Sequence, residues 1–202
     1  MTKQLSKAPP SIIERTRVPI ARLPGRAARA TGRAARAEGL ANDIGLHMER
    51  QLHSNWCWAA VAASVANFYE PKSKWTQCAV VSRELGRRVC HRKGANGKDN
   101  VFGHLQKSLK IVGHAKRPPY VKRSLTFDRA QREIDAGRPL GVRTEWAGGN
   151  IGHFVAVVGY HKQFDMLTVA DPYYGRQNVD YEAFRNSYRG LGTWTHSYCT
   201  KV

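Results

Sequence analysis

The stretch QLHSNWCWAA, residues 51–60, places a cysteine between two tryptophans at the point where a polar segment becomes an apolar run. Ser54 or Asn55 can cap a helix that extends from Trp56 to about Tyr69. Most residues along this span are apolar, so we expect the helix to be buried on most sides. The cysteine then lies in the first turn of a buried central helix.

A thiol in the first turn of a helix is well placed for chemistry. Unpaired backbone N–H groups and the positive end of the helix dipole stabilise a thiolate there. A purely structural cysteine would sit more naturally inside the apolar run, as an inert buried thiol. Cys57 is therefore the candidate nucleophile, and it needs a base and a group that orients the base.

A histidine and an aspartate follow on two neighbouring predicted strands. His153 opens the apolar strand of GGNIGHFVAVVGY (148–160), after a glycine-rich turn that leaves room for a substrate. Asp171 ends the next predicted strand, 166–172, and the short HKQFD loop (161–165) makes the two strands antiparallel neighbours. The hairpin therefore predicts Asp171 beside His153, where it can orient the imidazole. The alternatives are a structural strand histidine and a turn-forming aspartate.

The order of the predicted elements is that of an α+β fold, because helices come first and strands second. In TFDRAQREIDAGRP (126–139), Thr126 caps a helix, Gly137 ends it and Pro139 prevents its continuation. Weaker helical patterns cover about 76–87, 100–111 and 181–188. Strands are predicted at 141–146, 153–161, 166–172 and 193–202.

Composition separates an N-terminal extension from the folded part of the chain. Residues 1–45 contain a tandem repeat, GRAARATGRAARAEG (25–39), and few large apolar side chains. We expect a basic, low-complexity, mobile extension over 1–45 and one globular domain over 46–202. If the repeat is helical, four arginines align on one face: Arg26, Arg29, Arg33 and Arg36. That face would suit an anionic membrane surface or an acidic partner, and a plain solvated tail is the alternative.

Charge and cysteine content narrow the class of protein. The 202-residue chain has a formal net charge of +18, which favours solubility and attraction to acidic partners without identifying one. No apolar run approaches the ~20 residues that cross a bilayer, and no conventional signal peptide is evident. The four cysteines include no Cys-x-x-Cys pair, so we expect no metal and no cofactor. Cys78 and Cys90 could pair in an oxidising compartment.

The segments around the three candidates resemble the papain-like cysteine proteases, most closely the compact bacterial branch that includes effector proteases injected into host cells. The resemblance covers about residues 46–202 and rests on Cys57 with a glutamine six residues before it, on GHFVAVVGY and on ADPYYG. The segments WTQC, AGRPLGVR and YRGLGTWT also look like recurring parts of that branch. Asn55 and Trp56 before the cysteine, and an aspartate in place of papain's asparagine, point to the compact branch.

The resemblance implies a papain-like α+β fold, with the cysteine on a buried central helix and the histidine and aspartate on an antiparallel sheet. By position, Cys57 is the nucleophile, His153 the general base and acid, and Asp171 the orienting residue. The side-chain amide of Gln51 would donate to the oxyanion together with the Cys57 backbone N–H, and the alternative for Gln51 is an ordinary surface amide.

The function implied is that of a cysteine endopeptidase acting on protein substrates through an acyl-enzyme, in the context of a secreted bacterial effector. The same triad would also serve a glutamine deamidase or a transglutaminase. A catalytically idle basic module that binds nucleic acid is the alternative from another class, but no nucleic-acid motif supports it.

Overall fold

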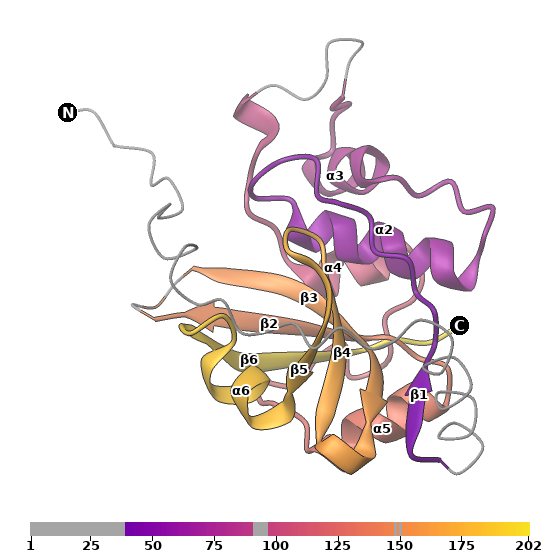
Figure 1. The fold of residues 1–202 in the computed structure, drawn as a ribbon. Coiled ribbons are helices and arrows are strands. Elements are labelled where there is room, and N and C mark those ends of the chain that lie inside the picture. The colour runs from indigo at the N-terminus through magenta and orange to yellow at the C-terminus, as the bar shows by residue number, and fades with distance from the viewer. Residues whose placement is uncertain (1–38, 91–96, 148, 150) are drawn as a thin grey trace.

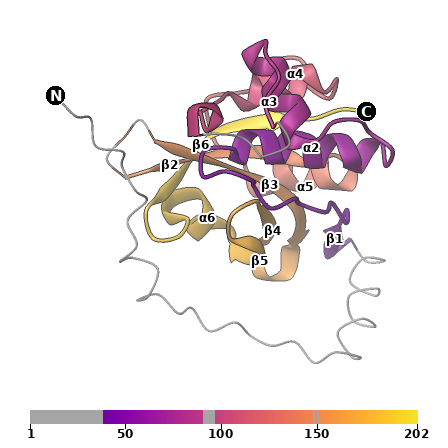
Figure 2. The same cartoon turned by 90° about the horizontal axis from the view of Figure 1, so that it is seen from above.

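The computed structural model describes residues 39–90, 97–147, 149 and 151–202. An antiparallel sheet separates two groups of helices (Figures 1 and 2). One group lies on the side of the central helix and comprises α2 (Cys57–Tyr69), α3 (Gln77–Leu85) and α4 (Leu105–Ile111). The other comprises α5 (Phe127–Asp135) and α6 (Tyr181–Ser187). The predicted α+β order is confirmed, and the arginine repeat lies outside the described residues.

The sheet has the strand order β5-β4-β3-β2-β6, with β1 paired to one end of β3. Its strands are β1 (Ala41–Asp43), β2 (Leu140–Trp146), β3 (Gly152–His161), β4 (Met166–Asp171), β5 (Gly175–Asp180) and β6 (Gly192–Cys199). The predicted hairpin is present, because β3 and β4 pair antiparallel with Val157 opposite Val169. Strand β5 was not predicted, since its exposed sequence GRQNVD carries no alternating apolar pattern.

Both faces of β3 are buried, which explains its nearly continuous apolar sequence. Phe154, Ala156 and Val158 pack in the cluster formed with α2, whereas Val155 and Val157 pack in the cluster that includes α5 and α6. Fully burying one valine or leucine side chain contributes about 1.5–3 kcal/mol, so these two clusters hold the layers together. Strand β3 is therefore the central element of the domain.

Helix α2 is buried along the first ten of its thirteen residues, from Cys57 to Ala66. The helix begins at Cys57 with Trp56 in the N-cap position and no side-chain cap, so the expected capping by Ser54 or Asn55 is wrong. Asn55 instead donates its side-chain amide to the carbonyl of Asn100 at 2.9 Å.

A loop near residue 100 is fastened against the start of α2 by the two tryptophans that flank Cys57. The indole of Trp56 donates to the Asp99 carbonyl at 2.8 Å, and that of Trp58 donates to the Val101 carbonyl at 3.2 Å. A Cβ atom at Gly103 would lie 2.3 Å from the Trp58 ring, so only glycine fits there. The tryptophans thus act as packing residues that fix the start of α2.

Two further observations bear on sequence expectations. Cys78 and Cys90, whose pairing the sequence left open, form a disulfide. No helix within the described ranges has the length and apolar character that a membrane crossing requires.

The sheet extends to residues that precede the boundary expected between residues 45 and 46. Strand β1 pairs with β3, with Ala41 opposite His161 and Asp43 opposite Gly159. The Lys162 N–H donates to the Leu40 carbonyl at 2.7 Å, and Ala41 is buried. The packed part of the chain therefore reaches back to about residue 40.

A chain that starts at residue 46 should be less stable than one that starts at residue 39, because it loses β1 and its backbone hydrogen bonds. At roughly 0.5–1.5 kcal/mol for each bond, we expect a loss on the order of 2 kcal/mol and a melting temperature about 5 °C lower. Thermal and urea unfolding of the two chains measure the difference. Equal midpoints would place the boundary at residue 46, as the sequence suggested.

Candidate active site

The three candidate residues come from the ends of three different elements. Cys57 is the first residue of α2, His153 the second of β3, and Asp171 the last of β4. Because β3 and β4 run antiparallel, the start of one and the end of the other lie at the same end of the hairpin. Helix α2 packs on this sheet and brings its N-terminus to the same place.

The side chains form a connected series of thiol, imidazole and carboxylate. His153 Nε2 lies 2.9 Å from Asp171 Oδ1, and the His153 side chain is also hydrogen-bonded to Cys57. Since Nε2 faces the carboxylate, Nδ1 is the ring nitrogen that remains for the thiol. The exposed fractions are 7% for Cys57, 8% for His153 and 2% for Asp171, so water reaches the series only at its edge.

The charges of His153 and Asp171 stabilise one another. Burial alone would lower the pKa of His153, but the charge and hydrogen bond of Asp171, with the hydrogen bond to Cys57, raise it from 6.5 to about 10. Burial would raise the pKa of Asp171, but the His153 charge and hydrogen bonds from His153, Tyr174 and Tyr173 lower it. The pair is therefore an imidazolium and a carboxylate near neutral pH.

Asp171 accepts hydrogen bonds from other groups besides His153. The backbone N–H groups of Tyr173 and Tyr174 donate to Oδ1 at 2.7 and 2.9 Å, and the Tyr188 hydroxyl donates to Oδ2 at 2.8 Å. Gln177 Nε2 donates to the Tyr188 oxygen at 2.6 Å. The hydroxyl therefore keeps its single hydrogen for Asp171, and the carboxylate cannot rotate without losing a bond.

Aromatic rings enclose the pair. The Trp146 ring stacks on His153 with centroids 6.1 Å apart, and it stacks on Tyr188 at 6.5 Å. Tyr174 meets His153 edge-on at 6.2 Å, and the guanidinium of Arg189 lies over the Tyr174 ring at 4.3 Å. These rings limit the access of water and strengthen the interaction between the charges.

Gln51 lies close to this site but uses its amide elsewhere. Its backbone N–H donates to the Pro172 carbonyl at 2.9 Å, which ties it to the residue after Asp171. Its side-chain Nε2 donates to the carbonyls of His53 and Ser54 at 2.9 and 2.8 Å. Reversing the amide would bring its oxygen against two carbonyl oxygens, so this orientation is the favoured one. Both donors are thus engaged within the loop that precedes Cys57.

Sequence reasoning did not find Tyr188, Gln177 or Trp146 as parts of the site. Tyr188 begins YRGLGTWT, a segment noted only for its resemblance to recurring segments. Its contact with Asp171 depends on the way α6 returns the chain to the sheet, and no local pattern encodes that return. Among the described residues, no group of three or more His, Cys, Asp or Glu side chains is arranged to hold a metal ion.

Comparison with solved structures finds similar folds at low sequence identity. The peptidase domain of Streptococcus ComA, a bi-functional ABC transporter involved in a quorum sensing pathway, matches with 20% identity and a TM-score of 0.50, covering 78% of this chain and 99% of that one. A double glycine motif protease from an AMS/PCAT transporter, solved with the leader peptide, matches with 18% identity and a TM-score of 0.45, covering 80% and 95%. Xylellain, a cysteine protease from Xylella fastidiosa, matches with 14% identity and a TM-score of 0.49, covering 81% and 86%.

The match to a family model extends over most of the described chain. No curated protein sequence matches, but residues 44–196 match the model of the Peptidase_C39 like family. This range contains the central helix, nearly all of the sheet and every candidate residue of the site. The chain therefore belongs to the Peptidase_C39 like family and is a papain-like cysteine peptidase.

Proposed function

We propose that the protein hydrolyses peptide bonds through a triad of Cys57, His153 and Asp171. The observation that carries the proposal is the position of His153, which is hydrogen-bonded to Asp171 on one side and to Cys57 on the other. Membership of a peptidase family favours a peptide bond over the glutamine side chain that a deamidase or transglutaminase would use. The comparisons lend no support to a role as an injected effector.

In the proposed mechanism Cys57 reacts as a thiolate paired with the imidazolium of His153, and its sulfur attacks the substrate carbonyl carbon to form a tetrahedral oxyanion. His153 then gives its proton to the leaving amine, and an acyl-enzyme remains on Cys57. A water molecule, deprotonated by His153, attacks the acyl group, and cleavage of the carbon–sulfur bond releases the carboxylic acid product and regenerates the Cys57 thiolate and the His153 imidazolium. Asp171 holds the imidazole in place through both steps, with Tyr188 as a positioning residue for its carboxylate.

The oxyanion would be stabilised at the start of α2. The first N–H groups of a helix have no intrahelical acceptor, and within the described residues the Cys57 N–H has none. Gln51 would supply the second donor. Its backbone hydrogen bond to Pro172, the residue after Asp171, holds it near the site. For this role one amide hydrogen of Gln51 has to leave its loop carbonyl when the oxyanion forms.

The substrate is proposed to be a peptide with apolar side chains beside the cleaved bond. Exposed apolar residues lie close in sequence to the site residues: Leu52 follows Gln51, Ile151 precedes His153 by two residues, and Tyr173 follows Asp171 by two. Such residues bury apolar surface when a peptide binds.

Replacing the nucleophile tests the proposal directly. Cys57→Ala should abolish cleavage of a protein mixture, because it removes the atom that forms the acyl-enzyme. Cys199→Ala is the matched control, since Cys199 is the other free cysteine of the described chain and lies on β6. Mass spectrometry of the fragments measures cleavage. Ammonia release or crosslinks without backbone fragments would contradict peptidase activity, and residual cleavage by Cys57→Ala would contradict the nucleophile.

The pH profile tests the charge relation between His153 and Asp171. Activity needs protonated His153 for the leaving amine, so kcat/KM should fall on the alkaline side only as pH rises towards 10. Asp171→Asn removes the main charge that raises the His153 pKa, so the effect of burial, which lowers this pKa, becomes dominant. The pH at which activity falls on the alkaline side should then decrease by roughly 1–3 units. An unshifted limb in the variant would mean that Asp171 does not set the protonation of His153.

Gln51→Ala tests the oxyanion donor. Loss of one such donor lowers kcat by about 10²–10³-fold, with little change in KM because the interaction forms in the transition state. Gln106→Ala on α4 removes a glutamine amide from another part of the protein and should leave kcat unchanged. Steady-state kinetics on a peptide, with circular dichroism to check the fold, measure the effect. An unchanged kcat for Gln51→Ala would assign the second donor to another group.

A further inference from the structure

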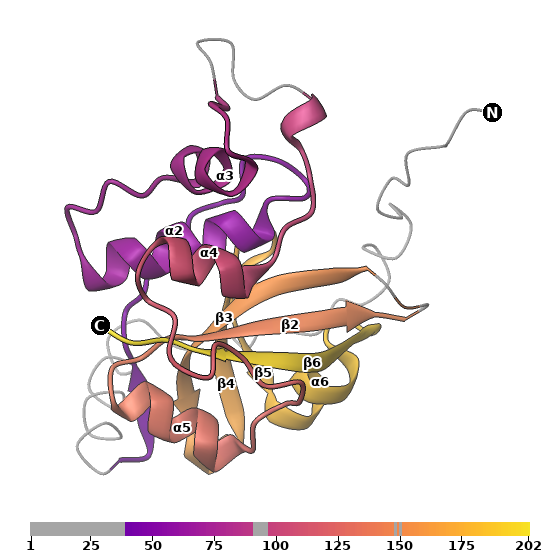
Figure 3. The ribbon, with the colours of Figure 1, turned by 180° about the vertical axis from the view of Figure 1, so that it is seen from behind.

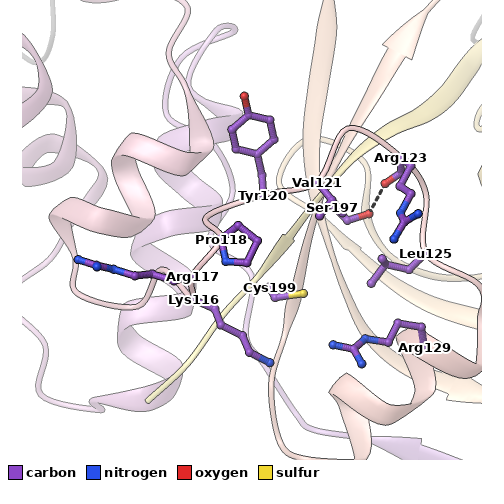
Figure 4. Close-up of a pocket in the computed structure, with 10 residues that line it drawn as sticks. All are labelled: Lys116, Arg117, Pro118, Tyr120, Val121, Arg123, Leu125, Arg129, Ser197 and Cys199. Atoms are coloured by element: carbon purple, nitrogen blue, oxygen red, sulfur yellow. Dashed lines mark hydrogen bonds between the residues drawn. The ribbon is translucent and has the colours of Figure 1, made fainter.

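A hollow of about 320 Å³ lies beside the edge strand β6, between that strand, α5 and the linker that joins α4 to α5 (Figure 4). Figure 3 shows this side of the molecule, where the linker runs along β6. The proposed peptidase function does not use the hollow. Its lining, however, has a composition that indicates a ligand.

The linker is held on β6 by hydrogen bonds that are independent of any ligand. Val121 and Ser197 exchange both backbone hydrogen bonds, at 2.9 and 3.0 Å, and the Lys116 N–H donates to the Cys199 carbonyl at 3.1 Å. The Ser197 hydroxyl donates to the Arg123 carbonyl at 2.7 Å. The backbone of the hollow is therefore built in advance, which lowers the cost of binding.

Positive charges converge on the hollow. Its lining includes Lys116, Arg117, Arg123 and Arg129, and no acidic residue. In Figure 4 the charged ends of Lys116 and Arg129 approach one another beside Cys199, and the guanidinium of Arg123 lines the same hollow on the other side of Leu125. Cations that line one hollow repel one another, and an anion bound in the hollow reduces that repulsion.

One nearby carboxylate neutralises only part of this positive charge. Glu133 is buried, and it pairs with Arg138 at 2.6 Å, with Arg129 at 3.1 Å and with Lys116 at 3.7 Å. Arg123 has no ion-pair partner in the part of the chain that the structure describes. One carboxylate is thus shared by Arg138 and two of the four lining cations, and the remaining positive charge lies in a concave site that attracts anions.

The other lining residues indicate the chemical character of the rest of the ligand. Pro118, Val121 and Leu125 supply an apolar wall next to the cations. We infer that the hollow binds a small organic oxyanion, a phosphate or carboxylate group on a compact apolar body, with Arg123 as the principal anchor. A guanidinium can bind either group through two parallel hydrogen bonds.

The inferred site is separate from the triad. Cys199 pairs with Leu140 on β2, whereas His153 pairs with Thr144, four residues further along the same strand. This places the two sites about 13 Å apart along the strands, and β6 is also two strands away from β3. A ligand in the hollow would therefore not occupy the space beside Cys57.

Calorimetric titration of the full chain with phenyl phosphate, in a low-salt buffer without phosphate, tests the inference. Arg123→Gln should weaken binding roughly tenfold or more, because it removes a charge-assisted pair of hydrogen bonds. Arg88→Gln is the charge-matched control, since Arg88 is exposed and lies in the loop after α3. It should leave the affinity unchanged. Lys116→Gln, on the opposite wall, should weaken binding as well.

Two further ligands separate the contributions of the apolar wall and of the anionic group. Inorganic phosphate should bind more weakly than phenyl phosphate, because it makes no contact with the wall, and benzoate shows whether a carboxylate is preferred to a phosphate. Absence of binding by the native chain would overturn the inference. So would equal losses in Arg123→Gln and Arg88→Gln, which would mean that the net charge of the chain attracts anions without a site.

Discussion

The close packing of α2 on the sheet is the constraint on which the rest of the site depends. A helix that is alanine-rich along its buried part can approach β3 closely, and this approach puts the first residue of α2 over the first residues of β3. The tryptophans on either side of Cys57 fix the rotation of the helix through their indole hydrogen bonds to the loop near residue 100. The proposed nucleophile is thus positioned by the hydrophobic core, and the pair of His153 and Asp171 is assembled on the sheet beneath it.

The parts of the fold that follow a local pattern could be predicted from the sequence. The apolar run after Trp56 gave the central helix, and the short loop between two β-branched segments gave the β3–β4 hairpin, which then placed Asp171 beside His153. Thr126 caps α5 as expected, with its hydroxyl accepting from the Arg129 N–H at 3.3 Å. Each of these features depends on residues close together in the chain.

The features that were missed depend on tertiary context. Strand β1 comprises only three residues and is defined by its partner β3, while β5 is exposed and lacks alternation. Tyr188 reaches Asp171 because α6 folds back on the sheet, and the engaged amide of Gln51 depends on the path of a turn. The prediction of the helix cap was wrong for a related reason, since the Asn55 side chain is hydrogen-bonded to Asn100 and does not cap the helix.

The disulfide between Cys78 and Cys90 has a consequence for where such an enzyme can work. The same small domain holds one oxidised cysteine pair and the free thiol of Cys57, whose proposed role as the nucleophile requires the reduced state. An environment that oxidises Cys78 and Cys90 to a disulfide can also oxidise Cys57, because thiolates are the species that oxidants attack. With Cys78 and Cys90 paired to each other, and with Cys199 on β6, two strands away from β3, a sulfenic acid on Cys57 would depend on an external thiol for its repair. The disulfide and the proposed nucleophile therefore place opposite demands on the redox conditions around the protein.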